Sequence, residues 1–125
     1  MARSSRHRWL RIEPVGEVVV ATFTESDILD LEMIRGLGDQ LLSLADDEGR
    51  RIVLNFQNVS RLSTALVGKV VALQQRLKKL GGRLALCQVA PHLREAMSLL
   101  KLPQLVPIYA HEQEGLEKLE QASKK

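Results

Sequence analysis

Two adjacent hydroxyl side chains, Ser63 and Thr64, stand where a polar turn after Phe56 gives way to a stretch with helical apolar spacing. Hydroxyl groups at the start of a helix accept hydrogen bonds from free backbone N–H groups, so capping alone explains their presence. The same position also suits regulation, because the free amides and the dipole of a helix N-terminus tolerate a phosphate group. Spacing alone leaves both interpretations open and favours the cap.

The three histidines and the single cysteine are residue types common at metal sites and in nucleophilic catalysis. His7, His92 and His111 have no carboxylate or cysteine around them at the spacing of metal ligands. Cys87 lies in an apolar run, which predicts a buried, inert thiol, and as the only cysteine it excludes an internal disulfide. The sequence therefore predicts no metal site and a reducing, cytoplasmic location.

Charged and glycine-rich segments near the predicted helix ends also have ordinary explanations. Glu112 and Glu114 are interpreted as solvated charges in a first helical turn, where carboxylates complement the helix dipole. Gly81-Gly82 lacks the lysine and hydroxyl residue of a phosphate loop, and it follows a predicted helix, whereas phosphate loops precede one. Because no nucleophile is paired with a base, we expect no catalytic residues, no cofactor and no enzymatic activity.

Length and composition predict one domain. The 125 residues are 45% hydrophobic, which is enough to fill a single core. Only 3% are aromatic, so stacking platforms for single-stranded nucleic acid are not expected. No stretch approaches the roughly 20 apolar residues of a membrane span, and a membrane is not expected among the partners. The expected divisions are a flexible arm at 1–8, a domain at 9–122 and a C-terminal tail at 123–125.

The predicted arm is basic. Arg3, Arg6, Arg8 and Arg11 supply much of the charge behind the formal net value of +3. A solvated terminus is the preferred interpretation, and no nucleic acid is expected as a partner. The alternative, a nucleic-acid contact, predicts strongly salt-dependent binding that is lost when residues 1–8 are deleted.

Apolar periodicity divides the chain into alternating strands and helices. Short apolar runs predict strands at residues 9–13, 18–23, 51–56, 83–89 and 106–109. Helical spacing, glycine stops and prolines predict helices at residues 26–47, 65–80, 91–100 and 111–122. The order β-β-α-β-α-β-α-β-α indicates an α/β domain whose mixed sheet is largely parallel in its middle.

The predicted helices should bury apolar stripes against the sheet. The stripe residues are Leu31, Ile34, Leu37, Leu41, Leu44 and Ala45 in the first helix, Leu66, Val70, Leu73, Leu77 and Leu80 in the second, and Leu93, Ala96, Met97 and Leu100 in the third. Two glycines, Gly36 and Gly38, weaken the first helix by about 1 kcal/mol each relative to alanine. The sequence alone offers no reason for them.

The segment from Asn55 to Gly68 resembles the strand-loop-helix junction of the STAS family. Bacterial anti-sigma factor antagonists of that family carry the pattern Asp-Leu-Ser-x-Val-x-Phe-Met-Asp-Ser-Ser-Gly-Leu-Gly there. Asn55 stands at the first Asp of the pattern, Ser63 at the second Asp and Thr64 at the phosphorylated serine. The resemblance continues through residues 83–97 and 106–109 and covers roughly residues 12–120.

The resemblance implies a STAS fold, with a mixed four- to five-stranded sheet and about four helices. It also implies an antagonist that binds an anti-sigma factor of the histidine-kinase ATPase class, which is a serine/threonine protein kinase, and a cognate phosphatase as a further partner. The phosphorylation site it implies is Thr64, with Ser63 as the second candidate. The partner-binding residues it implies are Asn58, Ser60, Arg61, Ser63, Thr64, Val67 and Gly68.

A second function remains open at this point. In this alternative, the chain is a non-catalytic STAS scaffold subunit of a larger sensory assembly, and Ser63 and Thr64 only cap the helix. A stable assembly of high mass would favour the scaffold, whereas phosphate on Thr64 would favour the antagonist.

Overall fold

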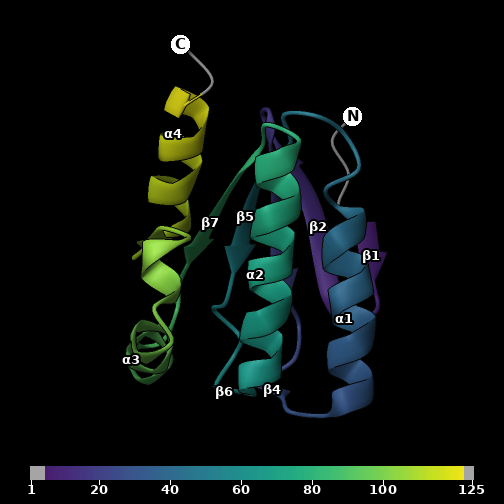
Figure 1. Cartoon of the computed structure of the whole chain (residues 1–125), viewed down its shortest axis with the longest axis vertical. Helices are drawn as coiled ribbons and strands as arrows, with labels where there is room; N and C mark the ends of the chain where they lie inside the picture. Colours follow the sequence, from purple (N-terminus) through teal and green to yellow (C-terminus); the bar gives the residue numbers. More distant parts are fainter. Residues whose placement is uncertain (1–4, 123–125) are drawn as a thin grey trace.

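A mixed sheet forms the centre of the computed structural model, which describes residues 5–122 (Figure 1). Three strands, β1 (Ser5–His7), β2 (Leu10–Val15) and β3 (Val18–Phe23), pair antiparallel at one side. The strands β5 (Arg51–Asn55), β7 (Arg83–Cys87) and β8 (Ile108–Tyr109) continue from β3 in parallel. The order β1-β2-β3-β5-β7-β8 confirms the expected mixed sheet with a parallel middle.

The helices follow the expected alternation with the strands. They are α1 (Leu31–Ser43), α2 (Thr64–Lys79), α3 (Pro91–Leu99) and α4 (Glu112–Ala122), with a short 3₁₀ turn, η1 (Leu102–Gln104), after α3. Two further strands of two residues each, β4 (Asp27–Ile28) and β6 (Arg61–Leu62), pair with each other outside the main sheet. Neither was expected from the sequence, because two residues are too few for a period-2 pattern.

Residues 5–7 belong to the sheet, although the sequence analysis placed them in a flexible arm. Their strand pairs antiparallel with the first residues of β2, in the register Ser5 with Ile12 and His7 with Leu10. The turn between them uses a positive φ of 73° at Trp9, over whose ring the Arg8 guanidinium lies at 4.5 Å from the centroid. The charged side chains of this segment indicated a solvated terminus, so a strand of only three residues was not predicted from the sequence. Residues 1–4 and 123–125 of the expected arm and tail lie outside the described residues.

The first helix begins later than expected because Asp30 caps it. The Asp30 carboxylate accepts a hydrogen bond from the backbone N–H of Met33 at 2.9 Å, so residues 26–29 are free to form β4 and its connection. The glycines inside α1 allow close approaches. A Cβ at Gly36 would collide with the Trp9 ring, and one at Gly38 would lie 2.6 Å from the Lys69 side chain.

The core has two parts, one on each face of the sheet. The larger lies beneath α1, α2 and α3, where the stripe of Leu66, Val70, Leu73 and Leu77 is buried as expected. The smaller lies beneath α4, which covers Val18, Val53 and Cys87 through Leu116 and Leu119. Three stripe residues were wrong: Leu31, the first residue of α1, is 70% exposed, and Leu100, the C-cap of α3, is 48% exposed. Ala96 of α3 is exposed as well.

Candidate functional site

The hydroxyl pair lies at the carboxyl end of β5, at the foot of the molecule in Figure 1, near the labels β4 and β6. The strand ends at Asn55, and residues 57–63 form a loop that returns through β6 to the start of α2. Phe56 anchors the base of this loop, since its ring packs against Phe23 with centroids 4.7 Å apart. Val59, within the loop, is buried as well, so the loop contributes an apolar side chain to the core.

Backbone hydrogen bonds hold the 57–63 loop against the segment that leads into α1. The N–H groups of Ser60 and Arg61 both donate to the carbonyl of Ser26, at 2.8 and 3.1 Å. The N–H of Ser63 donates to the carbonyl of Ile28 at 3.0 Å. These bonds pair three backbone N–H groups of the loop and tie its path to the segment before α1.

Three side chains reinforce this arrangement. Arg61 donates two hydrogen bonds to the Asp27 carboxylate, at 3.2 and 2.6 Å. The His92 ring lies 2.6 Å from the carbonyl of Ser60, which ties the loop to the start of α3. Asn58 donates to the carbonyl of Phe23 at 3.0 Å. The hydrogen bonds from Arg61, followed by its charge, hold the pKa of Asp27 below its ordinary value.

Ser63 and Thr64 have different surroundings. Ser63 is the N-cap of α2, and its half-buried hydroxyl accepts a hydrogen bond from the N–H of Ala65 at 3.1 Å. Thr64 is the first residue of the helix, and its side chain is exposed. Its hydroxyl has no hydrogen-bond partner among the described residues. The helix carries no acidic residue in its first turn, so no carboxylate of that turn offsets the positive end of its dipole.

Five of the seven residues singled out for partner binding are exposed, Ser63 is half-buried and Val67 is buried. Asn58, Ser60, Arg61, Thr64 and Gly68 are exposed, and a Cβ at Gly68 would meet open space. Val67 is only 7% exposed and contributes to the core beneath α2. It lies three residues before Val70 and beside Leu66, on the face of α2 that packs against the sheet.

Two exposed leucines beside the 57–63 loop were missed by the sequence analysis. Leu29 is 44% exposed and Leu31 is 70% exposed, on either side of the cap residue Asp30. They adjoin the hydroxyl pair, because β4 pairs with β6 and the carbonyl of Ile28 accepts from Ser63. The signal was the Asp-Leu step at 30–31, which marks a helix start and so removes Leu31 from the buried stripe.

A polar link connects the base of the loop to α4. Asn55, 2% exposed, donates from its side chain to the Glu112 carboxylate at 2.7 Å and accepts from the N–H of Gln57 at 2.8 Å. The N–H of Glu112 donates in turn to the Gln88 side chain at 3.2 Å. Glu112 was interpreted as a solvated charge, but it is half-buried and is the acceptor for a buried amide.

The thiol of Cys87 lies beside this link and is buried beneath α4. Burial, followed by the charge of Glu112, raises the pKa of Cys87 to about 12. A thiol in that state is a poor nucleophile at neutral pH. Among the described side chains, no three His, Cys, Asp or Glu residues gather closely enough to hold a metal ion. Within residues 5–122, none of the helices has the length and apolar character needed to cross a bilayer.

A family model described as the STAS domain matches residues 11–115. The chain is 26% identical over 108 residues to a protein named anti-sigma F factor antagonist from Paenibacillus polymyxa, in a match that covers 86% of this chain and 91% of that protein.

Solved structures share the fold. An anti-sigma-factor antagonist (STAS) domain protein from Planctomyces limnophilus superposes with a TM-score of 0.81 at 19% identity, covering 88% of this chain and 97% of the other. The phosphorylated form of the Bacillus cell fate determinant SpoIIAA superposes with a TM-score of 0.65 at 19% identity, covering 87% and 97%.

Proposed function

The chain belongs to the STAS domain family, and from that premise we propose that it is an anti-sigma factor antagonist, which acts by binding a partner protein and not by catalysis. Its partner is an anti-sigma factor that is also a serine/threonine kinase of the histidine-kinase ATPase class. Thr64 is the residue that this kinase phosphorylates, and a cognate phosphatase reverses the modification. The relative from Paenibacillus polymyxa, whose name carries the same function, supports the proposal.

The observation that carries the proposal is the exposed hydroxyl of Thr64 at the first position of α2. A kinase must reach the acceptor oxygen without unfolding its substrate, and this hydroxyl is both exposed and unbonded among the described residues. Ser63 is the poorer acceptor, because its hydroxyl is half-buried and engaged in capping the helix. Phosphate on Ser63 would remove that cap, whereas phosphate on Thr64 would leave it in place.

The partner surface is formed by the 57–63 loop and the start of α2, with Asn58, Ser60, Arg61 and Gly68 around Thr64. The backbone bonds to Ser26 and Ile28 support this assignment, since they order the loop before the partner arrives. A loop that is already ordered loses little conformational freedom on binding, which favours affinity.

Phosphate on Thr64 is expected to act as an off-switch. The helix start stabilises a dianion through its dipole and free N–H groups, so the fold tolerates the modification. An interface formed around a neutral hydroxyl has to desolvate the added charge, so the partner dissociates.

The test begins with co-purification of the partner from the native cell, and calorimetry then compares three proteins. Wild type and Thr64→Ala should bind the partner with similar affinity. Thr64→Asp should bind at least about tenfold more weakly, which corresponds to about 1.4 kcal/mol. Thr64→Asn is the matched control, because it has the size of the Asp variant without the charge, and it should stay within a few-fold of wild type.

Incubation with the purified partner and ATP, followed by mass spectrometry, tests the kinase step directly. Phosphate should appear on Thr64 in wild type and be absent from Thr64→Ala, whereas Ser63→Ala should still be modified. Modification confined to Ser63 would reverse the assignment of the acceptor. Equal partner affinity for wild type and Thr64→Asp, with no phosphate found on either hydroxyl, would leave an unregulated binding domain.

A further inference from the structure

Two exposed leucines, Leu29 and Leu31, lie at the end of the molecule that carries Thr64. They flank Asp30, the N-cap of α1. A single exposed leucine is common on protein surfaces and has no special meaning, whereas apolar side chains that gather in one place mark interaction sites. The position of this pair relative to Thr64 and its contribution to the fold therefore decide between the two interpretations.

The start of α1 lies beside the start of α2. β4 and β6 run parallel, and directly after them Leu29 lies beside Ser63, because the carbonyl of Ile28 accepts a hydrogen bond from the N–H of Ser63 at 3.0 Å. Each segment then enters a helix, so Leu31 and Thr64 are the first residues of α1 and α2. The two helices lie side by side, and both begin at the foot of the molecule (Figure 1). The leucines therefore extend the surface around Thr64.

Neither leucine is needed by the fold. Both are outside the two core clusters and are not among the half-buried side chains that pack against them. The start of α1 is fixed by the Asp30 carboxylate, and the buried residues of this helix begin only at Ile34. Exposed apolar side chains are unfavourable in water, and burial against a partner relieves that cost. The two leucines are thus available to a partner.

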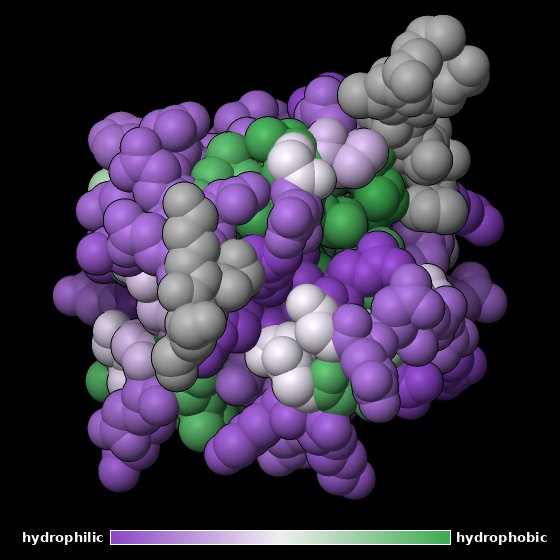
Figure 2. Space-filling model, turned by 90° about the horizontal axis from the view of Figure 1, so that it is seen from above, coloured by the Kyte–Doolittle hydropathy of each residue, from purple (hydrophilic) through white to green (hydrophobic). Residues whose placement is uncertain are grey.

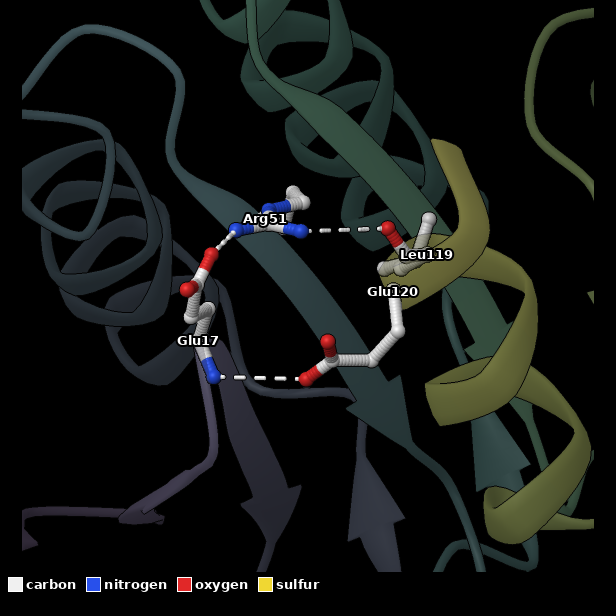
Figure 3. Close-up of polar contacts among 4 residues, drawn as sticks. All are labelled: Glu17, Arg51, Leu119 and Glu120. Carbon is white, nitrogen blue, oxygen red and sulfur yellow. Dashed lines mark hydrogen bonds and ion pairs between the residues drawn. The ribbon is translucent and has the colours of Figure 1, made fainter. Parts of the chain in front are cut away.

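The opposite end of the molecule is arranged differently. There Arg51 forms an ion pair with Glu17 and donates to the carbonyl of Leu119 at 3.4 Å. Glu120 accepts a hydrogen bond from the N–H of Glu17 (Figure 3). These polar groups are used within the fold, and Figure 2, which views that end, shows a largely hydrophilic surface with hydrophobic patches between the polar side chains. At the Thr64 end, the ion pair between β4 and β6 joins these strands but leaves both leucines exposed.

The charge around the two leucines is negative. Four carboxylates lie between residues 25 and 32, and the sequence has no lysine, arginine or histidine from residue 12 to residue 34. Asp27 is paired with Arg61, whereas Glu32, in the first turn of α1, is exposed and takes part in none of the ion pairs of the described residues. An apolar centre with an acidic rim is complementary to an apolar pocket with lysine or arginine at its edge.

We propose that Leu29 and Leu31 are apolar anchors of the interface with the anti-sigma factor, which receives them in an apolar pocket edged by lysine or arginine. This inference rests on the proposed function, because it concerns the same partner, and it adds a second region to the surface around Thr64. The hydrogen bonds of Asp30 and Ser63 hold the leucines in place before binding, so little conformational freedom is lost. Burial of the leucines supplies affinity, and Glu32 contributes to the orientation of the partner.

Calorimetry with the anti-sigma factor co-purified from the native cell tests the anchors. Leu29→Ala and Leu31→Ala should each weaken binding about five- to twentyfold, because apolar area is lost from the interface. Their denaturant midpoints should stay near that of wild type. Leu105→Ala is the matched control, since this leucine is also exposed but lies near Arg83, at the start of β7 and thus at the opposite end of the sheet. Its affinity should stay within about twofold of wild type.

Charge variants test the acidic rim. Glu32→Lys should weaken binding more than Glu32→Gln does, because it brings a cation against the partner's cations, and the difference should shrink as salt is added. Glu117→Lys makes the same change at an exposed position of α4, on the other face of the sheet, and should bind as wild type does.

The proposal is overturned if both leucine variants bind as tightly as wild type, or if Leu105→Ala weakens binding as much as they do. Weak binding by Thr64→Asp together with unchanged binding by the leucine variants would refute the anchors and leave the proposed function in place. Absence of any bound anti-sigma factor would refute both. Sedimentation of wild type and Leu31→Ala tests the other occupant: self-association that this variant abolishes, with unchanged partner affinity, would assign the leucines to a contact between copies of the chain.

Discussion

Arg61 and Asp27 join two strands of only two residues each, β6 and β4, in which they are direct register partners. The guanidinium donates two hydrogen bonds to the carboxylate, and both side chains are exposed. Exposed ion pairs contribute little to global stability. This pair therefore acts locally, by keeping β6, and with it the 57–63 loop, against β4.

Removing this ion pair should loosen the loop without unfolding the domain. In the variants Asp27→Asn and Arg61→Gln, the backbone amides at positions 61 and 63 should exchange with solvent faster than in wild type, while the denaturant midpoint stays near that of wild type. The pKa of Asp27 is lowered in the fold, so its contribution exists at neutral pH and is lost as pH falls through that lowered value. Hydrogen exchange measured by NMR checks this, with Arg94→Gln as a control. Unchanged exchange at both amides would show that the backbone hydrogen bonds to Ser26 and Ile28 are enough to hold the loop without the ion pair.

The two adjacent hydroxyls should differ in their effect on stability. Ser63→Ala removes the acceptor for the N–H of Ala65 and should cost about 1 kcal/mol of unfolding free energy. Thr64→Ala removes an exposed side chain without a described hydrogen-bond partner and should cost less than about half of that. Urea denaturation of both variants makes the comparison. Equal losses would mean that Thr64 shares the capping role.

Two leucines, Leu73 in α2 and Leu31 in α1, should differ strongly in their contribution to stability. Leu73 is fully buried, so Leu73→Ala should lower the unfolding free energy by about 2–5 kcal/mol through lost transfer energy and a residual cavity. Leu31→Ala is the matched control, because that leucine is 70% exposed, and its cost should lie within about 0.5 kcal/mol. Denaturant midpoints measure both effects. A large loss of unfolding free energy for Leu31→Ala would mean that this side chain makes a contact that the structure of the single chain does not contain.

Long periodic segments were predictable from the sequence, and short or context-dependent ones were not. The stripe from Leu66 to Leu77 spans several turns, so its period identifies both the helix and its buried face. The pairing of Asp27 with Arg61 involves two residues on each side and depends on a loop path that only tertiary contacts fix. Gly36 looked unfavourable in isolation, since the sequence does not reveal that the Trp9 ring lies against it.

The same limit applied to the candidate site. The position of Thr64 at a helix start followed from local pattern, and the structure confirms it. The half-buried role of Glu112 did not, because its partner Asn55 is 57 residues away in the chain. Side-chain partners at such separations leave no periodic signal.

Cys87 should be unreactive in the folded protein. Iodoacetamide should label it slowly at neutral pH and rapidly in denaturant, because the thiol is buried and its pKa is raised to about 12. A raised pKa means that the fold favours the neutral thiol, so this stability is present below the ordinary value of 9.0 and is lost as pH rises from there towards 12. Melting curves of wild type and Cys87→Ala between pH 8 and about pH 10 should show a steeper loss in wild type. Parallel curves would contradict the shift.

The side-chain amide of Asn55 links the end of β5 to Glu112 at the start of α4, and this link depends on an amide at position 55. The Asn55 side chain donates to the Glu112 carboxylate and accepts from the N–H of Gln57, so both ends of the amide are used. An aspartate can still accept from Gln57, but it has no proton to donate to Glu112 and instead faces it with a second negative charge. Because the position is 2% exposed, water cannot screen that repulsion effectively.

Asn55→Asp should therefore lower the unfolding free energy by about 1–3 kcal/mol at neutral pH, mainly by weakening the attachment of α4. The deficit should shrink as the pH falls to about 4, the ordinary range of an aspartic acid, since a proton on the introduced carboxyl restores a donor towards Glu112. Glu112→Gln alone should cost less, because the glutamine oxygen still accepts from Asn55, and the double variant Asn55→Asp/Glu112→Gln should recover most of the lost stability. Urea titrations of the four proteins at two pH values complete the cycle. If the double variant is as unstable as Asn55→Asp alone, the loss arises from burying a carboxylate and not from its repulsion by Glu112.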